Sequence, residues 1–179
     1  MPSESVNEDV AARLCAACGM CCDGVMFHSM LLQPGDSARE LAALGLKVKR
    51  RKAGAFIPQP CTAHQGSCCS IYERRPIRCR VFVCRQLIYV GSGKIGEPEA
   101  REKIDRARAL TTRVQAILRE VGDEREHKAL AARCAMALTP PFESGPDAVR
   151  RREDLAAAMS ELEAFLAQEF RNPEEPESH

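Results

Sequence analysis

The sequence has few aromatic residues and almost no net charge. It contains no tryptophan, two tyrosines and six phenylalanines among 179 residues, so a large core must be built from Leu, Ile, Val, Ala and Met. Lys and Arg total 26 against 25 Asp and Glu, and this formal charge of +1 creates no overall field that would attract nucleic acid or acidic lipid. Hydrophobic residues reach 45%, which excludes wholesale disorder and favours a globular chain.

Long apolar runs are also missing. No stretch approaches the about 18 apolar residues that a membrane-spanning helix needs. The first nine residues include Glu4, Glu8 and Asp9 and no apolar segment, unlike a secretory signal or an Arg-rich transit peptide. We therefore expect a cytoplasmic protein without a membrane partner, in a compartment that keeps thiols reduced.

Cysteine is the residue present in excess. Nine of the ten cysteines lie between Cys15 and Cys84, and only Cys134 lies in the second half. Disulfide scaffolds are usually chains of under about 80 residues with little other core, whereas a long helical region follows these cysteines. Metal binding is therefore the favoured interpretation. Charge divides in the same way, with 12 basic and 7 acidic residues up to position 90 but 14 and 18 after it.

The chain divides into four parts. We expect a flexible tail at 1–12, a cysteine-cluster metal-binding region at 13–90, a helical region at 91–171 packed on it to form one domain, and a disordered tail at 172–179. Apolar residues spaced by three and four predict helices over 98–122, 123–138 and 147–170. The predicted fold class is mainly α, with an irregular metal-centred region of little sheet braced by about three amphipathic helices.

Short elements are expected within the cysteine region. Residues 34–37 read as a turn and cap that start a helix ended by Gly45, and 56–58 read as an extended piece. The segments 81–83 and 87–90 are short and β-prone. The basic run 47–52 is most simply a solvated loop, with an acidic partner or nucleic acid as the alternative.

The first cysteine motif is C-x2-C-x2-C-C, formed by Cys15, Cys18, Cys21 and Cys22. Two intervening residues let two sulfurs reach one metal ion at about 2.3 Å, and Gly19 gives the chain freedom to turn around it. If the segment is helical, Cys15, Cys18 and Cys22 share a face and Cys21 points about 100° away. Because adjacent cysteines fit one tetrahedral centre poorly, two sites or one polynuclear cluster are both compatible with this motif.

The second motif contains Cys61, Cys68, Cys69, Cys79 and Cys84. Four thiolates around one divalent ion leave a charge of about −2, which requires compensation when buried. Five arginines lie beside these cysteines and are candidate hydrogen-bond donors to sulfur, the alternative being a solvated basic face: Arg74, Arg75, Arg78, Arg80 and Arg85.

These two motifs, in this order and spacing, resemble the YkgJ-type cysteine-cluster family over about residues 13–90. That family is described as a zinc- or iron-chelating domain and is related to flagellin lysine N-methylases. The resemblance implies eight metal ligands: Cys15, Cys18, Cys21, Cys22, Cys61, Cys69, Cys79 and Cys84. Cys134, on the apolar stripe of a predicted helix, is interpreted as a buried small hydrophobe, and Cys68 as a spare, redox-sensitive neighbour. His28 and His64 could each replace a sulfur as ligand, but with eight cysteines available a surface or hydrogen-bonded histidine is the favoured interpretation of both.

The leading hypothesis is a metal-binding protein that holds zinc or an iron or iron–sulfur centre, because all-thiolate ligands suit both. One alternative is a cluster-dependent enzyme of protein methyltransferase or redox type, although neither an S-adenosylmethionine site nor the C-x3-C-x2-C spacing of radical enzymes is recognisable. Another is an accessory protein that delivers metal or docks a protein partner through its helical half.

Overall fold

The structure is a computed structural model that describes residues 8–66, 68–140 and 145–172. Its helices are α1 (Glu8–Cys18), α2 (Ala38–Ala43), α3 (Ile77–Val81), α4 (Arg85–Gly91), α5 (Glu97–Glu120), α6 (Leu130–Ala137) and α7 (Pro146–Glu169), with a 3-10 turn at Tyr72–Arg74. The strands are short: β1 (Ser29–Leu31), β2 (Lys49–Arg51), β3 (Gly54–Pro58), β4 (His64–Gln65) and β5 (Cys68–Cys69). The predicted mainly α fold class with little sheet is confirmed.

The ends of the chain bear on two expectations. Helix α1 already includes residues 8–12, which were expected within a flexible tail. Residues 1–7 and 173–179, which make up most of the two expected tails, lie outside the described residues. Among the helices of the described ranges, none combines the length and the apolar run needed to cross a bilayer.

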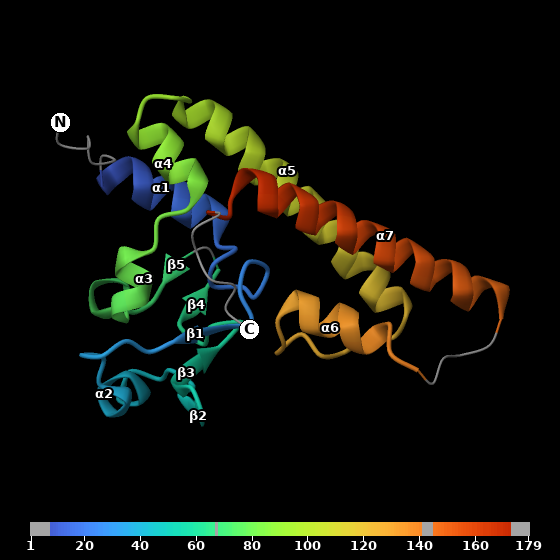
Figure 1. The fold of residues 1–179 in the computed structure, drawn as a ribbon, viewed down its shortest axis with the longest axis horizontal. Helices are drawn as coiled ribbons and strands as arrows, with labels where there is room; N and C mark the ends of the chain where they lie inside the picture. The colour runs from blue at the N-terminus through green and yellow to red at the C-terminus, as the bar shows by residue number, and fades with distance from the viewer. Residues whose placement is uncertain (1–7, 67, 141–144, 173–179) are drawn as a thin grey trace.

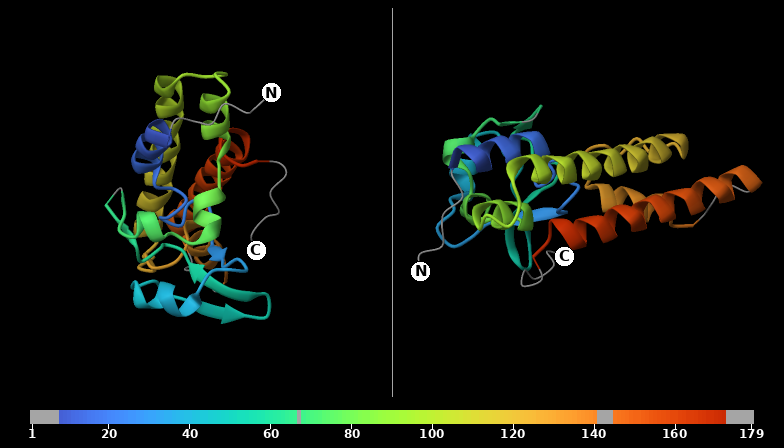
Figure 2. Two further views of the ribbon diagram at one scale, coloured as in Figure 1. Left: turned by 90° about the vertical axis from the view of Figure 1, so that its left-hand side faces the viewer. Right: turned by 90° about the horizontal axis from the view of Figure 1, so that it is seen from above.

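Two long antiparallel helices, α5 and α7, form the extended arm of the molecule (Figures 1 and 2). The predicted stripe of α5 is buried as expected, from Ile104 through Val114 to Leu118. Pro98 stands in the first turn of α5, and Gly122, with a φ of +77°, follows its end. Helices α1 and α6 complete this helical core, which also includes Leu87 of α4.

Helix α6 is shorter than predicted. The expected helix over 123–138 begins only at Leu130, because the residues before it form turns and irregular backbone. Asp123 is buried there and its carboxylate accepts hydrogen bonds from Arg125 and Arg133, while the Leu130 N–H donates to the Gly24 carbonyl at 2.9 Å. Side-chain bonds of this kind compete with a helical backbone, which explains the late start.

A second, smaller core lies under a three-stranded antiparallel sheet in the order β1-β3-β2. Met30 pairs with Ile57 and Arg51 pairs with Gly54 across the central strand. The expected turn at 34–37 and its helix are present, since the Ser37 side chain caps α2. The basic run 47–52, expected as a loop, contains the edge strand β2, and all residues of this strand are exposed. Their charged side chains protect the edge of the sheet from pairing with another chain.

The β-prone prediction for 87–90 is wrong, because α4 covers these residues. In 81–83, Val81 ends α3, and the next two residues connect the helices, with extended backbone at Phe82 but no strand. Contacts with the end of α7 account for the helix at 87–90. The Arg85 N–H donates to the Phe170 carbonyl at 3.0 Å, and the buried Gln86 side chain donates to the Glu169 carbonyl at 2.5 Å. These bonds satisfy carbonyls that the helix end leaves free, so tertiary context overrides strand propensity.

Candidate metal centre

The first cysteine motif spans the end of α1 and the turn after it. Cys15 and Cys18 lie in α1, and the Gly19 N–H donates to the Cys15 carbonyl at 2.9 Å. Gly19 has a φ of +66°, a left-handed conformation that glycine adopts without strain. The shared helical face considered for Cys15, Cys18 and Cys22 does not include Cys22, because the helix ends at Cys18. The adjacent pair Cys21–Cys22 lies in a turn.

This turn is anchored to the helical half of the molecule. The N–H groups of Cys22 and Asp23 both donate to the Gly19 carbonyl, at 2.9 and 3.1 Å. The Met20 side chain is fully buried in the helical core, and the Asp23 carboxylate forms an ion pair with Arg108 of α5. The backbone that carries Cys21 and Cys22 is therefore held in place by contacts on both sides of the pair.

The second motif approaches the turn through the β4–β5 hairpin. The Cys61 N–H donates to the Cys22 carbonyl at 2.7 Å, which brings the two motifs together. In the hairpin His64 pairs with Cys69 and Gln65 with Cys68. Neighbouring residues of a strand point to opposite faces, and Cys69 is half-buried whereas Cys68 is exposed. The hairpin thus separates the two adjacent cysteines.

Cys79 and Cys84 come from the two short helices that follow. Cys79 lies in α3, whose first N–H, that of Ile77, donates to the Asp36 carboxylate at 2.9 Å. Cys84 is the N-cap residue of α4, and the Asn172 side chain donates to the neighbouring Val83 carbonyl at 2.8 Å. One cysteine is therefore attached to the small sheet half through Asp36, and the other to the end of α7.

All ten cysteines lie within the described residues, and none of them is joined in a disulfide bond. Burial raises the pKa of Cys18 and of Cys22 to about 12, and it raises the pKa of Cys21 well above its usual value. Burial also raises the pKa of Cys79 to about 11, with the Cys61 and Cys69 thiols adding to the effect. Without a cation nearby, these thiols stay protonated at neutral pH.

The interactions between thiols divide them into two sets. The pKa of Cys18 is raised by burial and then by Cys84 and Cys15, and the same neighbours act on Cys21. The pKa of Cys22 is instead raised by burial and then by Cys61, Cys79 and Cys69. The described thiols therefore form a first set, Cys15, Cys18, Cys21 and Cys84, and a second set, Cys22, Cys61, Cys69 and Cys79, linked by the adjacent pair Cys21–Cys22.

Arg75 lies within electrostatic reach of both sets. Its positive charge opposes the burial that raises the pKa of Cys15 and of Cys79. The guanidinium packs over the Tyr72 ring at 3.5 Å from the ring centroid, and its Nε donates to the Tyr72 carbonyl at 2.8 Å. The charge of Arg75 thus acts on both sets, but its described hydrogen bond goes to a backbone carbonyl, so donation to sulfur stays a prediction. Arg74 and Arg80 are exposed.

The thiols stand near one another but do not close around a point. Throughout the ranges that the structure describes, no three Cys, His, Asp or Glu side chains are close enough to hold a metal ion as placed. The donor set itself fits zinc or iron, because all its members are soft thiols. His64 is an additional candidate donor, since its Nε2 is buried and has no hydrogen-bond partner among the described atoms. His28 is exposed, and Cys134 is buried in the helical core as expected.

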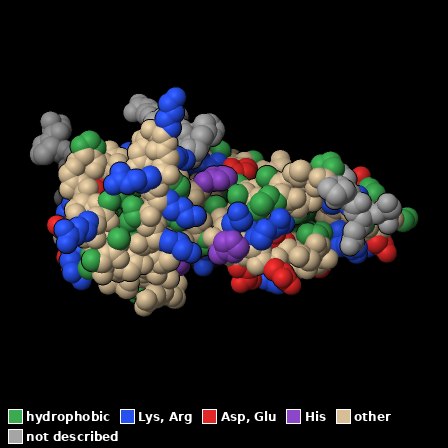
Figure 3. All heavy atoms as spheres, turned by 90° about the horizontal axis from the view of Figure 1, so that it is seen from below, with side chains coloured by type: hydrophobic (Ala, Val, Ile, Leu, Met, Phe, Trp, Pro, Cys, Tyr) green, Lys and Arg blue, Asp and Glu red, His purple; other side chains and the backbone are tan. Residues whose placement is uncertain are grey.

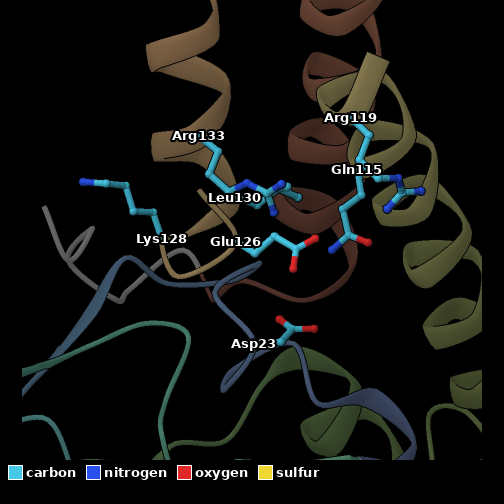
Figure 4. A pocket seen from close by; sticks show the side chains of 7 residues that line it. All are labelled: Asp23, Gln115, Arg119, Glu126, Lys128, Leu130 and Arg133. Atoms are coloured by element: carbon cyan, nitrogen blue, oxygen red, sulfur yellow. The ribbon is translucent and has the colours of Figure 1, made fainter. Parts of the chain in front are cut away.

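A polar cavity of about 210 Å³ lies beside the Cys21–Cys22 turn, between it and helices α5 and α6. Figure 4 shows the carboxylates of Asp23 and Glu126 and the Gln115 amide turned toward one another, with Lys128 pointing away. No cysteine lines this cavity, so it is separate from both sets of thiols.

Charge is distributed unevenly over the surface. On the face seen from below in Figure 3, the charged side chains of the cysteine half are mostly Lys and Arg, whereas Asp and Glu gather mainly along the helical half. This agrees with the excess of basic residues counted in the first 90 positions. The cysteine half therefore has positive charge available near groups that become anionic when they bind a metal.

Sequence reasoning missed three contacts of this region. Asp36 was read only as part of a turn, but its carboxylate also caps α3 ahead of Cys79. His64 approaches Gly19 so closely that a Cβ added at Gly19 would lie 3.1 Å from His64 Nε2. This approach and the ion pair between Asp23 and Arg108 join residues 45 and 85 positions apart. Pairings over such separations leave no local signal in one sequence.

Comparison with protein families gives one match. The CxxCxxCC family, described as "Putative zinc- or iron-chelating domain", matches residues 14–106, just over half of the chain. No match is found among curated proteins or among solved structures. The matched segment contains both cysteine motifs, the Cys21–Cys22 turn and helices α3 and α4, and it ends within α5. The chain therefore belongs to the CxxCxxCC family of zinc- or iron-chelating domains.

Proposed function

We propose that this protein binds zinc or iron, the latter as mononuclear or iron–sulfur centres, through eight cysteine thiolates. The proposed ligands are Cys15, Cys18, Cys21, Cys22, Cys61, Cys69, Cys79 and Cys84. Thiolates are the ligands of structural zinc sites and of iron–sulfur clusters, so this donor set suits both.

The observation that most supports this proposal is the clustering of thiols that come from distant parts of the chain. Thiols from α1, the following turn, the hairpin, α3 and α4 are near enough to act on one another's pKa. At neutral pH these thiols are protonated and uncharged, so their clustering costs the fold little, and a core built only to pack has no need of so many metal-ligating side chains in one place. A bound cation lowers the pKa of these thiols, since it stabilises every thiolate at once and releases the protons.

Charge compensation supports the same conclusion. Two groups of four thiolates with one divalent ion each carry a total charge of about −4. Arg75 is placed to offset part of this charge in both groups, because it acts on Cys15 and on Cys79. Its position is fixed by the contacts with Tyr72, so the compensation does not depend on a freely moving side chain.

Ligand closure is expected to accompany metal binding. Four sulfurs at about 2.3 Å from a tetrahedral ion lie roughly 3.8 Å apart, which is closer than the placed thiols allow in the described part of the chain. Metal binding should therefore draw the motifs together and order the segments between them, so that binding and folding are coupled.

The experiment that tests this proposal is elemental analysis with a visible absorption spectrum on protein purified without oxygen. Iron with acid-labile sulfide and a broad brown absorption would identify iron–sulfur centres, and a colourless protein with near-integral zinc would identify zinc sites. Cys22→Ser and Cys79→Ser should lower the metal content, whereas Cys134→Ser should not. Equal metal content in all three variants would contradict the ligand assignment.

A further inference from the structure

The adjacent cysteines Cys21 and Cys22 lie between two different parts of the molecule. The chain enters their turn from α1, through Cys18 and Gly19, on the side of the helical core. At Cys22 its carbonyl accepts the Cys61 N–H at 2.7 Å, on the side of the small sheet. Consecutive residues of one chain would therefore serve opposite sides of the turn.

Packing divides the other cysteines in the same way. Cys18 and Cys84 pack against the helical core, which consists of α1, α4, α5, α6 and α7 together with the buried Met20. Cys61 and Cys69 pack against the second core, formed by residues such as Leu41, Ile57 and Ile71. This division comes from apolar contacts alone, so it is independent of any charge on sulfur.

Backbone attachment assigns Cys79 to the sheet side and Cys84 to the helical side. Helix α3 is capped by Asp36, which lies between β1 and α2. Helix α4 is tied to the end of α7, where the Arg85 N–H donates to the Phe170 carbonyl at 3.0 Å. Figure 1 shows α3 beside the β4–β5 hairpin, whereas α4 lies with α1 and α5.

We propose that the eight thiolates form two separate tetrathiolate metal sites rather than one polynuclear centre. Site 1 consists of Cys15, Cys18, Cys21 and Cys84, and site 2 consists of Cys22, Cys61, Cys69 and Cys79. This inference rests on the proposed function, and it adds the number of sites and the membership of each.

Proximity between the thiols agrees with this assignment. Cys84 lies within electrostatic reach of Cys15, and Cys61 and Cys69 lie within reach of Cys79. The interaction between Cys21 and Cys22 joins the two sets, as expected for neighbours along the chain. Two adjacent residues can reach two ions more easily than they can reach one tetrahedral ion together. The adjacent cysteines at the end of the motif would therefore contribute one ligand to each site.

The test compares double variants that each remove two thiolates from the full-length chain. Cys15→Ser/Cys84→Ser damages site 1 only, whereas Cys84→Ser/Cys79→Ser damages both sites. Cys68→Ser/Cys134→Ser is the matched control, because both residues lie outside the two sets. Each protein is loaded with cobalt(II) without oxygen and challenged with a fixed excess of chelator. Retained metal is measured together with the visible absorption of tetrahedral cobalt thiolate, and circular dichroism checks that the helices are folded.

Two sites predict unequal outcomes for the two test variants. The wild type and the control should retain two cobalt ions per chain, the site 1 variant should retain one with an intact tetrathiolate spectrum, and the variant damaged in both sites should retain none. Equal loss from both test variants would overturn the two-site assignment while leaving metal binding in place. A wild type that retains no cobalt with a thiolate spectrum would overturn the proposed function as well.

Discussion

Replacing Gly19 with alanine is the most informative single change to the Cys21–Cys22 turn. Gly19 follows Cys18 with a φ of +66°, and its carbonyl accepts the N–H groups of Cys22 and Asp23. A Cβ added there would lie 3.1 Å from His64 Nε2, which is tighter than ordinary van der Waals contact. The substitution therefore introduces both backbone strain and a close contact between the two cysteine motifs.

The expected loss follows from these two effects. A non-glycine residue in the left-handed region costs roughly 1–2 kcal/mol. The turn is anchored by Met20 and Asp23, so relief of this strain shifts the Cys21–Cys22 pair relative to the other thiols, and the energy needed to bring the pair back subtracts from the free energy of metal binding. A loss of this size corresponds to a metal affinity about 5–30-fold lower. The contact with His64 adds to the loss unless the imidazole ring moves by a few tenths of an ångström.

Competition between the protein and a zinc chelator measures this effect. Gly122→Ala is the matched control, because Gly122 follows the end of α5 with a φ of +77° and an added Cβ would meet no atom within 4 Å. Both variants should lower the free energy of unfolding, but only Gly19→Ala should weaken metal binding. In a His64→Ala background, Gly19→Ala should weaken metal binding less than it does in the wild type, because the close contact is absent while any donor role of His64 is lost from both proteins of the pair. Equal metal affinity in Gly19→Ala and Gly122→Ala would refute this reasoning.

Three further predictions concern stability. Burial alone would raise the pKa of Asp123, but hydrogen bonds from Arg133 and Arg125 outweigh it and lower the pKa. The ionised Asp123 carboxylate therefore stabilises the fold above its usual pKa of 3.8, and this stabilisation is lost as the pH falls through the lowered pKa. Asp123→Asn should cost about 3–5 kcal/mol at pH 7, by leaving Arg133 buried without its partner, and much less in strong acid, as urea unfolding at both pH values will show. Leu155→Ala, at a fully buried position of α7, should cost about 2–5 kcal/mol in urea unfolding without changing metal content by elemental analysis. Chelation should abolish amide protection over 29–81, from β1 to α3, in hydrogen exchange, while α5 and α7 stay protected; uniform loss would contradict it.

Elements with a strong local pattern could be predicted from the sequence. The stripe of α5, its proline start and its glycine end agree with the structure, because a long amphipathic helix buries one face wherever its partner lies. The capped turn before α2 also agrees, since the Ser37 side chain needs only a residue three positions on. Local chemistry is sufficient for elements of this kind.

Elements fixed by distant contacts could not be predicted. Residues 87–90 are helical because Gln86 and Arg85 satisfy carbonyls at the end of α7, about 83 positions away. The division of the eight cysteines has the same origin. Spacing indicates that Cys21 and Cys22 serve different ions or one cluster, but only the fold shows Cys84 beside α1 and Cys61 against Cys22. A ligand set assembled from distant segments cannot be divided by spacing alone.

The two cores differ in size, and this difference gives the two proposed sites different consequences. Among the described residues, the helical core contains seventeen buried side chains and the sheet core only five. Ordering the chain costs roughly 1–2 kcal/mol per residue, which so small a core cannot offset alone. Site 2 would supply the missing stabilisation, because its four thiolates come from the turn, the hairpin and α3 that surround the sheet core.

Site 1 has a framework held by other contacts, since α1 packs on α5 and Cys84 lies between hydrogen bonds to the end of α7. We therefore expect the protein to tolerate loss or exchange of the metal at site 1 while folded, whereas loss at site 2 unfolds the sheet half.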